Sequence, residues 1–320
     1  MSYPFGFDLR SLEVFVEVVK SGTMTAAAQR LDISQSAISQ TLANIEETLE
    51  AQLIDRAVRP IQLTPDGRFF YDRSIRILDH ARQLSRSVKT GQVQHIDRAR
   101  IAMVDSLVTA IGKPLTELLK KQTAEWFIST GLSHIHAQSL LSHDVDIIIS
   151  DDQVFDGNEL KRYPILREPL IMVCPAGFQG GDDLIMSLAS QLDFARYPVH
   201  SLIGKSINHK LTRLQLELPR KLQLDNTAAI VNMVSTGLCW AITTPLCLYQ
   251  CRQWINGLVD VHPLPAPDDF RELTLVSRSY DLWTIPEEMA VNSRAILKDK
   301  IVPELIQWMP WLDAKISIQK

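Results

Sequence analysis

Uncharged polar residues recur at helical spacing between positions 35 and 44 of this 320-residue chain. They are Gln35, Ser36, Ser39, Gln40, Thr41 and Asn44. The amides of Gln and Asn can form two hydrogen bonds with the edge of adenine, and the hydroxyls of Ser and Thr suit a base or a phosphate. These residue types therefore indicate recognition of a nucleic acid rather than catalysis. The alternative is an ordinary solvated helix face.

The elements that must position these side chains are two short helices around a tight turn, within residues 23–49. Thr25 is expected to cap the first helix and Ser34 the second, because a hydroxyl can accept from a free N–H of the first turn. The opposite face of the second helix carries an apolar stripe that should contact a core: Ala37, Ile38, Leu42, Ile45 and Leu49. A second helix laid in the major groove by a first is the helix-turn-helix arrangement. An amphipathic helix over 8–20 precedes it.

A two-stranded wing is predicted next, from short β-like pieces at 53–54 and 61–63. Arg56 and Arg59 lie where such a wing would meet phosphates or the minor groove. The alternative for these two residues is an ordinary exposed arginine pair.

A long helix is predicted over residues 65–90, because Thr64 can cap it and Pro65 suits its first turn. Its apolar residues follow a 3.5-residue period, which predicts a dimerisation seam. The seam residues are Phe70, Ile77, Ala81, Leu84 and Val88. The alternative is that this stripe packs onto its own chain. Residues 91–98 indicate a hinge.

From residue 99 onward strands alternate with helices, which predicts an α/β fold with parallel, doubly wound sheets. Strands are expected at 100–104, 126–128, 145–149, 160–166, 169–174, 197–200, 222–224, 239–243 and 271–277, with 160–166 paired to 169–174. Helices are expected after Ser106 and at 132–142, 182–192, 228–235 and 292–308.

Candidate ligand contacts follow from this topology, because ligands bind at the carboxyl ends of parallel strands and helix N-termini favour anions there. The selected residues are Ser106, Ser129, Thr130, His200, Ser201, Thr227 and Thr243, with Asp151, Asn226 and Thr244 in similar positions. Each could instead be a cap or turn residue with no ligand. A small organic anion is the expected ligand.

Composition excludes several classes of protein. The net charge of −4 does not suit a general polyanion binder. No apolar run could span a membrane and no secretory signal is evident, so a cytoplasmic location is expected. The four cysteines are expected to be structural thiols, with a redox switch as the alternative. His134 and His136 would point apart on a helix, so no metal site is expected. Neither a catalytic motif nor a cofactor motif is present, and we expect no enzyme activity and no cofactor.

Residues 8–90 resemble the N-terminal part of LysR-type transcriptional regulators. The resemblance rests on the order and spacing of three segments, LRSLEVFVEVVKSGTMTAAAQRL, ISQSAISQTLANIEETL and LIDR followed by LTPDG. The later run NTAAIVNMVSTGLCWAITTP resembles the effector-domain signature of the family. By position, the residues that match the DNA-facing surface are Thr25, Ser34, Gln35, Ser36, Ser39 and Gln40, with Arg56 and Arg59 at the turn and wing.

The resemblance implies an all-α-type winged helix-turn-helix domain at 1–64, a linker and dimerisation helix at 65–90, and a hinge at 91–98. It also implies a two-lobed effector domain at 99–320, similar to periplasmic binding proteins. Lobe I would span about 99–174 and 271–320, and lobe II about 175–270.

The resemblance further implies the partners: double-stranded DNA with an inverted-repeat operator, a small-molecule effector, further copies in a homodimer or homotetramer, and RNA polymerase. The expected function is sequence-specific transcription regulation controlled by the effector. The alternative is a small-molecule binding protein whose DNA module is inactive or serves only assembly.

Three positions depart from the family pattern. Glu50 stands where a glycine is usual, Ile54 replaces a usual phenylalanine, and Gln40 stands where an arginine is frequent. Residues 1–64 hold five Lys or Arg against eight Asp or Glu, so nonspecific attraction to phosphates should be weak. Gln40 would favour adenine over guanine.

Overall fold

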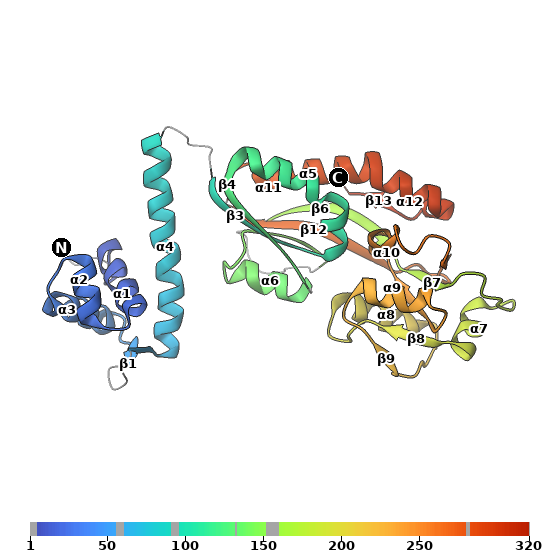
Figure 1. Ribbon diagram of the computed structural model, residues 1–320, viewed down its shortest axis with the longest axis horizontal. Coiled ribbons are helices and arrows are strands. Elements are labelled where there is room, and N and C mark those ends of the chain that lie inside the picture. Colours follow the sequence, from blue (N-terminus) through green and yellow to red (C-terminus); the bar gives the residue numbers. More distant parts are fainter. Residues whose placement is uncertain are drawn as a thin grey trace. The chain divides into compact units, whose positions relative to one another are not determined.

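The computed structural model describes residues 5–55, 61–90, 96–131, 133–151, 160–279 and 282–319. The chain forms two compact units, Met1–Gln94 and His95–Lys320, and each is described by itself (Figure 1). Among the described residues, no helix is both long enough and apolar enough to cross a membrane.

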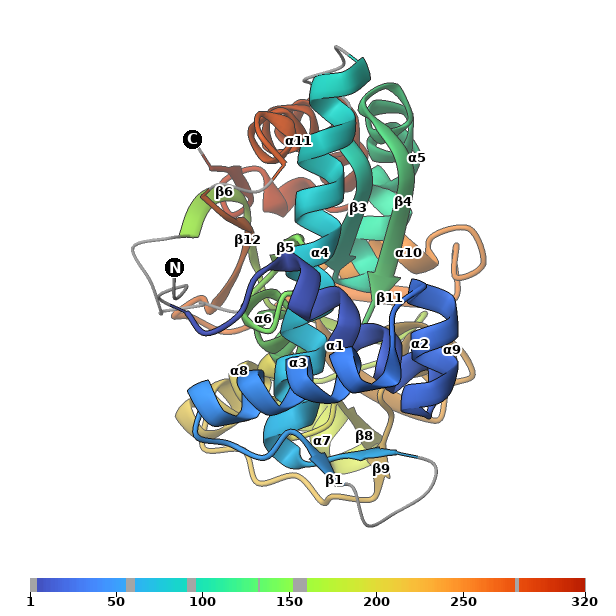
Figure 2. The ribbon, with the colours of Figure 1, turned by 90° about the vertical axis from the view of Figure 1, so that its left-hand side faces the viewer.

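The first unit is a helical bundle with a small hairpin at one end (Figure 2). Its elements are α1 (Leu9–Ser21), α2 (Met24–Leu31), α3 (Gln35–Thr48), β1 (Ile54–Asp55), β2 (Gln62–Leu63) and α4 (Pro65–Thr90). Phe15 from α1, Ile38 and Leu42 from α3, and Leu78 from α4 are all buried in one cluster. The apolar stripes of the helices therefore meet in a single core, as their spacing predicts.

The caps of these helices differ from expectation at one position. Thr23, not Thr25, caps α2: its backbone is extended and its Oγ1 accepts from the Ala26 N–H at 3.2 Å. Thr25 is the second residue of that helix, so the N-cap prediction for it is wrong. Ser34 caps α3 as predicted, accepting from the Ala37 N–H at 3.1 Å.

The wing forms as an antiparallel pair between β1 and β2. Thr64 then caps α4, because its hydroxyl accepts from the Gly67 N–H at 2.9 Å and donates to the Gln52 carbonyl at 2.6 Å. Gly67 lies so close to the wing that a Cβ built on it would overlap the Leu53 carbonyl oxygen. A glycine is therefore required where the wing turns into α4.

The second unit holds two sheets. The larger has the order β13-β6-β12-β5-β3-β4. Its strands are β3 (Ile96–Met103), β4 (Thr123–Thr130), β5 (Ile147–Ser150), β6 (Leu160–Pro169), β12 (Phe270–Arg278) and β13 (Ser317–Ile318). β3 pairs in parallel with β4 and β5, whereas β12 is antiparallel to β5 and β6. The carboxyl ends of β3, β4 and β5 therefore meet at one edge.

The smaller sheet has the order β11-β7-β10-β8-β9. Its strands are β7 (Ile171–Pro175), β8 (Asp193–Arg196), β9 (Leu222–Gln223), β10 (Cys239–Thr243) and β11 (Val259–Pro263). β8 pairs in parallel with β9 and β10, and β7 is antiparallel to β10 and β11. The chain passes between the two sheets at Leu170 and again between Pro263 and Phe270.

Helices cover both faces of the larger sheet: α5 (Asp105–Gln122) and α11 (Ile285–Ile296) lie along one face and α6 (Ser133–Leu141) along the other (Figure 1). Burial follows the alternation of β3, since Ile101 and Met103 pack in the main core and Ala102 packs with Leu140 of α6. The helices and helical turns of this unit are α5 (Asp105–Gln122), α6 (Ser133–Leu141), α7 (Leu184–Gln191), α8 (Leu202–Arg213), α9 (Thr227–Ser235), α10 (Pro245–Cys251), α11 (Ile285–Ile296), η1 (Leu297–Ile301), α12 (Val302–Trp308) and η2 (Pro310–Leu312).

The two sheets are mixed rather than wholly parallel, and three further predictions for this unit are wrong. The stretches 160–166 and 169–174 do not pair, because they lie in β6 and β7 of different sheets. Residues 197–200 are not a strand; the strand is β8, four residues earlier, where it can pair with both β9 and β10. The last helix begins at Ile285 rather than 292 and is interrupted by a π-helical turn over Leu297–Ile301.

We predict that Gly67→Ala lowers the free energy of unfolding of the first unit by about 1–3 kcal/mol, because the new methyl group forces α4 away from the wing. All six tryptophans lie between positions 126 and 311, so tryptophan fluorescence reports only the second unit. Urea unfolding should shift in circular dichroism and stay unchanged in fluorescence.

The control is Gly181→Ala, whose Cβ would lie 3.6 Å from the Ser187 hydroxyl in ordinary contact. It should leave the circular dichroism transition in place. Identical unfolding of Gly67→Ala and the unmodified chain would contradict the close approach at the wing.

Candidate nucleic-acid interface and ligand site

Helix α3 separates an apolar face from an uncharged polar face. Ile38, Leu42 and Ile45 are at most 1% exposed in the core of the first unit. The exposed side chains include Ser34, Gln35, Ser36 and Gln40, whereas Ser39 is half-buried. Ala37 is also exposed, so its assignment to the core stripe is wrong. The structure thus brings five of the predicted DNA contacts onto one short segment.

The other predicted DNA contacts lie on the neighbouring elements. Thr25 is exposed on α2. Arg56 and Arg59 fall outside the described residues, between the two wing strands. Their predicted role at the wing stays a prediction.

Glu46 is a positioning residue that the sequence did not reveal. Its Oε1 accepts from the backbone N–H groups of Leu53 at 2.8 Å and Ile54 at 3.1 Å. One carboxylate therefore ties the end of α3 to the first wing strand. A glutamate late in an amphipathic helix gives no signal of such a contact, because the partners are backbone groups.

Glu50 follows α3 with a φ of 51°. That is the left-handed region, where a side chain is disfavoured and glycine is not. Glycine adopts this conformation without strain, whereas the present chain adopts it with a glutamate.

The predicted seam on α4 divides into two parts. Phe70 packs edge-on against Phe7 and Phe15 of its own unit, with ring centroids 5.4 and 5.1 Å away. The alternative of packing onto the same chain therefore holds for Phe70. Further along, Leu84 and Val88 are each 69% exposed, Ile77 is 41% exposed, and Ala81 is half-buried. This second half of α4 leaves an apolar stripe uncovered within its unit.

In the second unit, Ser106 follows β3 as the second residue of α5 rather than as its cap. The cap position is Val104, which makes no side-chain hydrogen bond. Ser106 is 2% exposed, and its Oγ has no hydrogen-bond partner in the described part of the chain. A buried hydroxyl without a partner at the start of an 18-residue helix is a ready donor to a ligand.

The ends of β4 and β5 supply further polar groups. Thr130 is exposed at the last position of β4, and Ser129 is half-buried with its hydroxyl 3.4 Å from the Ile101 carbonyl oxygen. Asp151 follows β5 and is bound by Ser133 and by Arg271. The parallel register of β3 with β4 and β5 places these residues at one edge of the sheet.

Arg271 is the centre of a buried ion cluster that the sequence did not predict. Its side chain is 8% exposed and lies 2.9 Å from Asp151 and 3.6 Å from Glu168, which is fully buried at the end of β6. The other oxygen of Glu168 accepts from the Leu246 N–H at 2.8 Å. The three side chains thus join β5, β6 and β12 to the start of α10, near the first crossing between the sheets.

The two carboxylates respond differently to this cluster. Burial raises the pKa of Glu168, and the charge of Arg271 and the bond from Leu246 only partly oppose it. Burial also acts against ionisation of Asp151, but Arg271 and the hydrogen bond from Ser133 outweigh it and lower the pKa of Asp151. Arg271 is therefore a neutralised cation rather than a free one.

The second lobe contributes a buried hydroxyl group network. The Tyr197 hydroxyl lies 2.9 Å from the Thr227 hydroxyl and 2.8 Å from the Thr243 hydroxyl. Burial strongly raises the pKa of Tyr197, so this phenol stays protonated and acts as donor and acceptor. Thr227 and Thr243 are thus joined through Tyr197, which the sequence predicts to lie in a strand.

His200 and Ser201 lie in the loop before α8. His200 is exposed. Ser201 caps α8, accepting from the Gly204 N–H at 3.1 Å and donating to the Pro198 carbonyl at 2.7 Å. For Ser201 the alternative of a cap residue is the one that the structure shows.

A cavity of about 540 Å³ lies elsewhere, along the first halves of β3 and β4. Its lining is Arg98, Arg100, Ala124, Glu125, Trp126 and Phe127. Arg98 pairs with Glu125 at 2.9 Å and Arg100 with Asp146 at 2.7 Å, so both cations are neutralised. This is the opposite end of these strands from the predicted ligand contacts.

Comparison with known families gives two matches along the chain. Residues 9–68 match the family described as bacterial regulatory helix-turn-helix protein, lysR family. Residues 97–281 match the family described as LysR substrate binding domain. The second match alone covers more than half of the 320 residues.

Characterised relatives align over part of their length. The regulator BenM of Acinetobacter baylyi is 37% identical over 102 residues, which are 32% of this chain and 33% of BenM. The transcriptional activator AaeR of Escherichia coli is 28% identical over 154 residues, which are 48% of this chain and 50% of AaeR. The aligned stretches thus span a third to a half of these relatives.

Solved structures share the fold over nearly the whole chain. LysG of Corynebacterium glutamicum with bound effector arginine has a TM-score of 0.63 at 13% identity, covering 90% of this chain and 98% of LysG. CbnR complexed with its target DNA has a TM-score of 0.57 at 15% identity, covering 90% and 100% of the two chains.

We predict that Glu168→Gln becomes more stable relative to the unmodified chain as pH rises. The pKa of Glu168 is raised by burial, so above 4.5 the folded chain holds a proton that the unfolded chain has lost. The unmodified chain therefore loses stability as pH rises from 4.5 towards the raised pKa of Glu168, and a glutamine does not. Urea unfolding from about pH 4 to about pH 7 measures the difference.

The matched control is Glu272→Gln, an exposed neighbour of Arg271 on β12 that pairs with Arg167 at 3.4 Å. This variant keeps Glu168, so its stability should fall with rising pH as that of the unmodified chain does. A constant stability difference between Glu168→Gln and the unmodified chain across this range would contradict a raised pKa.

Proposed function

This chain belongs to the family of LysR-type transcriptional regulators, and we propose that it is a one-component regulator that binds specific DNA and responds to a small molecule. Proteins of this family bind DNA through the N-terminal helix-turn-helix and bind an effector through the C-terminal domain. The observation that carries the proposal for this chain is the exposed, uncharged face of α3, opposite a fully packed core.

The proposed DNA contacts are Thr25, Ser34, Gln35, Ser36, Ser39 and Gln40, with Arg56 and Arg59 at the wing. A helix that presents amides and hydroxyls at its amino-terminal half can place them against base edges in the major groove. The target would be an inverted repeat whose half-sites lie about one helical turn apart, since two copies of the chain would bind it.

The proposed assembly is a homodimer or homotetramer. The apolar stripe of Ile77, Leu84 and Val88 on α4 supports pairing of two linker helices, because its 3.5-residue period is that of a helix pair. Recruitment of RNA polymerase and a cytoplasmic location, where the target DNA lies, are part of the same proposal.

The proposed effector contacts are Ser106, Ser129, Thr130, His200, Thr227 and Thr243, from both lobes of the second unit. Ser106 supports this assignment most directly, since a buried hydroxyl without a partner is stabilised when a ligand accepts its hydrogen bond. A small organic anion fits the start of α5. Binding would shift the two lobes and so bias the DNA-binding units.

One observation supports a second function as an alternative to transcription regulation. Residues 1–64 carry more acidic than basic side chains, which favours a small-molecule binding protein whose DNA module is inactive. The two functions differ in whether the polar face of α3 is required for DNA binding.

We predict that Gln35→Ala combined with Ser39→Ala lowers the affinity for DNA upstream of the chain's own gene by at least about tenfold, because base contacts worth about 1–3 kcal/mol each are lost. A gel-shift titration with a scrambled duplex as competitor measures this loss.

Gln191→Ala, which removes the same type of side chain at the end of α7, is the control and should bind like the unmodified chain. Equal binding of the double variant and the unmodified chain would contradict the role of α3 and favour the second function.

We predict that Ser106→Ala keeps or raises the free energy of unfolding of the second unit, by up to about 1 kcal/mol, because no hydrogen bond is lost and a buried unpaired hydroxyl is removed. The same variant should lose the thermal shift that the unmodified chain gains from its ligand. Thermal unfolding followed by tryptophan fluorescence, against a panel of small carboxylic acids, measures both effects.

Ser201→Ala is the matched comparison, because Ser201 is equally buried but both caps α8 and donates to a carbonyl. It should lose about 1 kcal/mol of stability. A Ser106→Ala variant that loses as much stability, or that keeps its ligand response, would remove Ser106 from the effector site.

A further inference from the structure

Two exposed amides on α3 are joined by a hydrogen bond. Gln40 Nε2 donates to Asn44 Oδ1 at 2.7 Å, one helical turn further along. Residues four apart lie one above the other on the same helix face, so the pair forms a row with Ser36. The bond restrains a glutamine side chain that would otherwise rotate freely before it meets DNA.

The neighbouring hydroxyls on α3 are directed back to the helix. Thr41 donates to the Ala37 carbonyl at 2.9 Å, and Thr48 donates to the Asn44 carbonyl at 2.8 Å. Their hydrogen atoms are therefore committed within the helix. Between Gln40 and Thr48, the Gln40–Asn44 pair is therefore the polar group that we consider for contact with DNA.

The restrained Gln40 amide keeps one acceptor and one donor. An amide that presents its oxygen and an N–H to the same base edge matches the N6 amino donor and N7 acceptor of adenine. Guanine presents two acceptors at the same edge, so Oε1 would face the O6 atom without a hydrogen between them. The orientation of this amide thus decides between the two purines.

Charge limits how far along α3 the DNA can extend. Glu46, Glu47 and Glu50 follow Asn44, and like charges repel from phosphates. Asn44 is the last exposed uncharged residue before this acidic group. Asn44 therefore lies at the boundary between the uncharged face of α3 that can contact DNA and the acidic residues that would repel it. At this position it can hydrogen-bond Gln40 without having to contact DNA itself.

We propose that Asn44 is a positioning residue that holds the Gln40 amide in the orientation that reads adenine over guanine in the major groove. This inference rests on the proposed function, because it requires α3 to bind DNA. The inference adds two details to that function. One position of each half-site should contain adenine, and Asn44 should be the side chain that makes Gln40 select it.

The experiment selects duplexes from a randomised DNA library with the full-length chain and its variants, followed by affinity measurements on the selected sequence. Gln40→Ala identifies the base pair that Gln40 contacts, as the position whose preference disappears. At this position, duplexes with adenine, guanine or 7-deazaadenine, which lacks the N7 acceptor, are compared by fluorescence anisotropy.

The unmodified chain should prefer adenine over guanine by about 5- to 150-fold at that position. Asn44→Ala should reduce this preference by about 2- to 10-fold, because an unrestrained side chain must be ordered on binding. Asn44→Asp keeps the acceptor for Gln40 Nε2 and adds a negative charge, so it should keep the preference while binding all duplexes more weakly. Gln40→Arg should change the preferred base to guanine.

Glu47→Ala is the matched control, an exposed neighbour that should raise affinity for every duplex and leave the adenine preference unchanged. An unchanged preference in Asn44→Ala, or a selected sequence with no adenine that depends on Gln40, would overturn this inference and leave the proposed function intact. Failure of the unmodified chain to select any sequence would overturn both.

Discussion

The second unit depends on one buried arginine. Arg271 lies between Asp151 and Glu168 with almost no exposure, at the point where the chain crosses between the two sheets. Removal of one partner from such a buried group costs about 3–5 kcal/mol, because the remaining charges are left without compensation.

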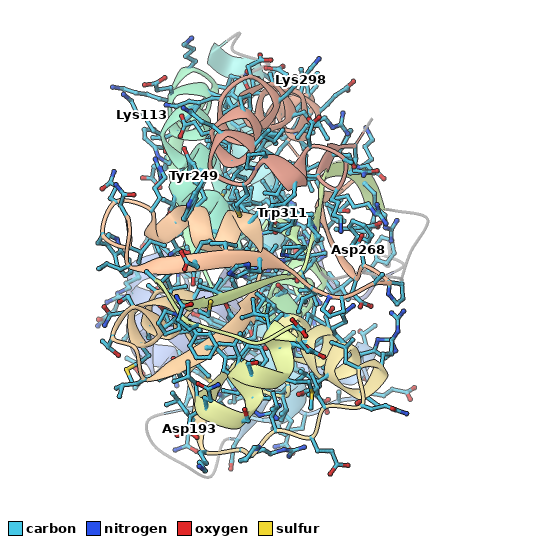
Figure 3. All side chains as sticks on the ribbon, turned by 90° about the vertical axis from the view of Figure 1, so that its right-hand side faces the viewer. Lys113, Asp193, Tyr249, Asp268, Lys298 and Trp311 are labelled. Carbon is cyan, nitrogen blue, oxygen red and sulfur yellow. The ribbon has the colours of Figure 1, made fainter. Side chains whose placement is uncertain are left out.

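The second crossing is held in a similar way, by Lys210, whose Nζ donates to the Pro265 and Pro267 carbonyls at 2.6 and 2.5 Å. Tyr249 of α10, labelled in Figure 3, donates to a carboxylate oxygen of Glu304 in α12 at 2.6 Å.

This arrangement decides what the ligand site can use. Since Arg271 is neutralised by Asp151, the proposed recognition of an anion would rest on hydroxyls and on the start of α5. Ser106 and the Tyr197, Thr227 and Thr243 network provide such neutral donors from the two lobes. In the first unit the same principle applies, because α3 offers amides and hydroxyls rather than cations. The chain therefore relies on directional hydrogen bonds more than on charge for both of its proposed contacts.

Local features were predictable from the sequence, and long-range pairs were not. The polar face of α3, the Ser34 and Thr64 caps and the wing follow from spacing and turn chemistry, and the structure confirms them. Thr25 was misassigned because Thr23, two residues earlier, is an equally good cap. The strand at 193–196 was missed because DFAR has no alternating pattern and is fixed by pairing on both sides. Glu46 and Arg271 contact groups that are close only after folding, so no spacing rule reveals them.

The most direct test of the central claim is a titration of the unmodified chain against DNA upstream of its own gene, with a scrambled duplex as competitor and over a range of salt. A regulator that reads bases through uncharged groups should form a discrete complex that resists the competitor, and its affinity should fall only gently with salt. Equal affinity for both duplexes at every salt concentration, or no complex with either, would contradict sequence-specific DNA binding by α3.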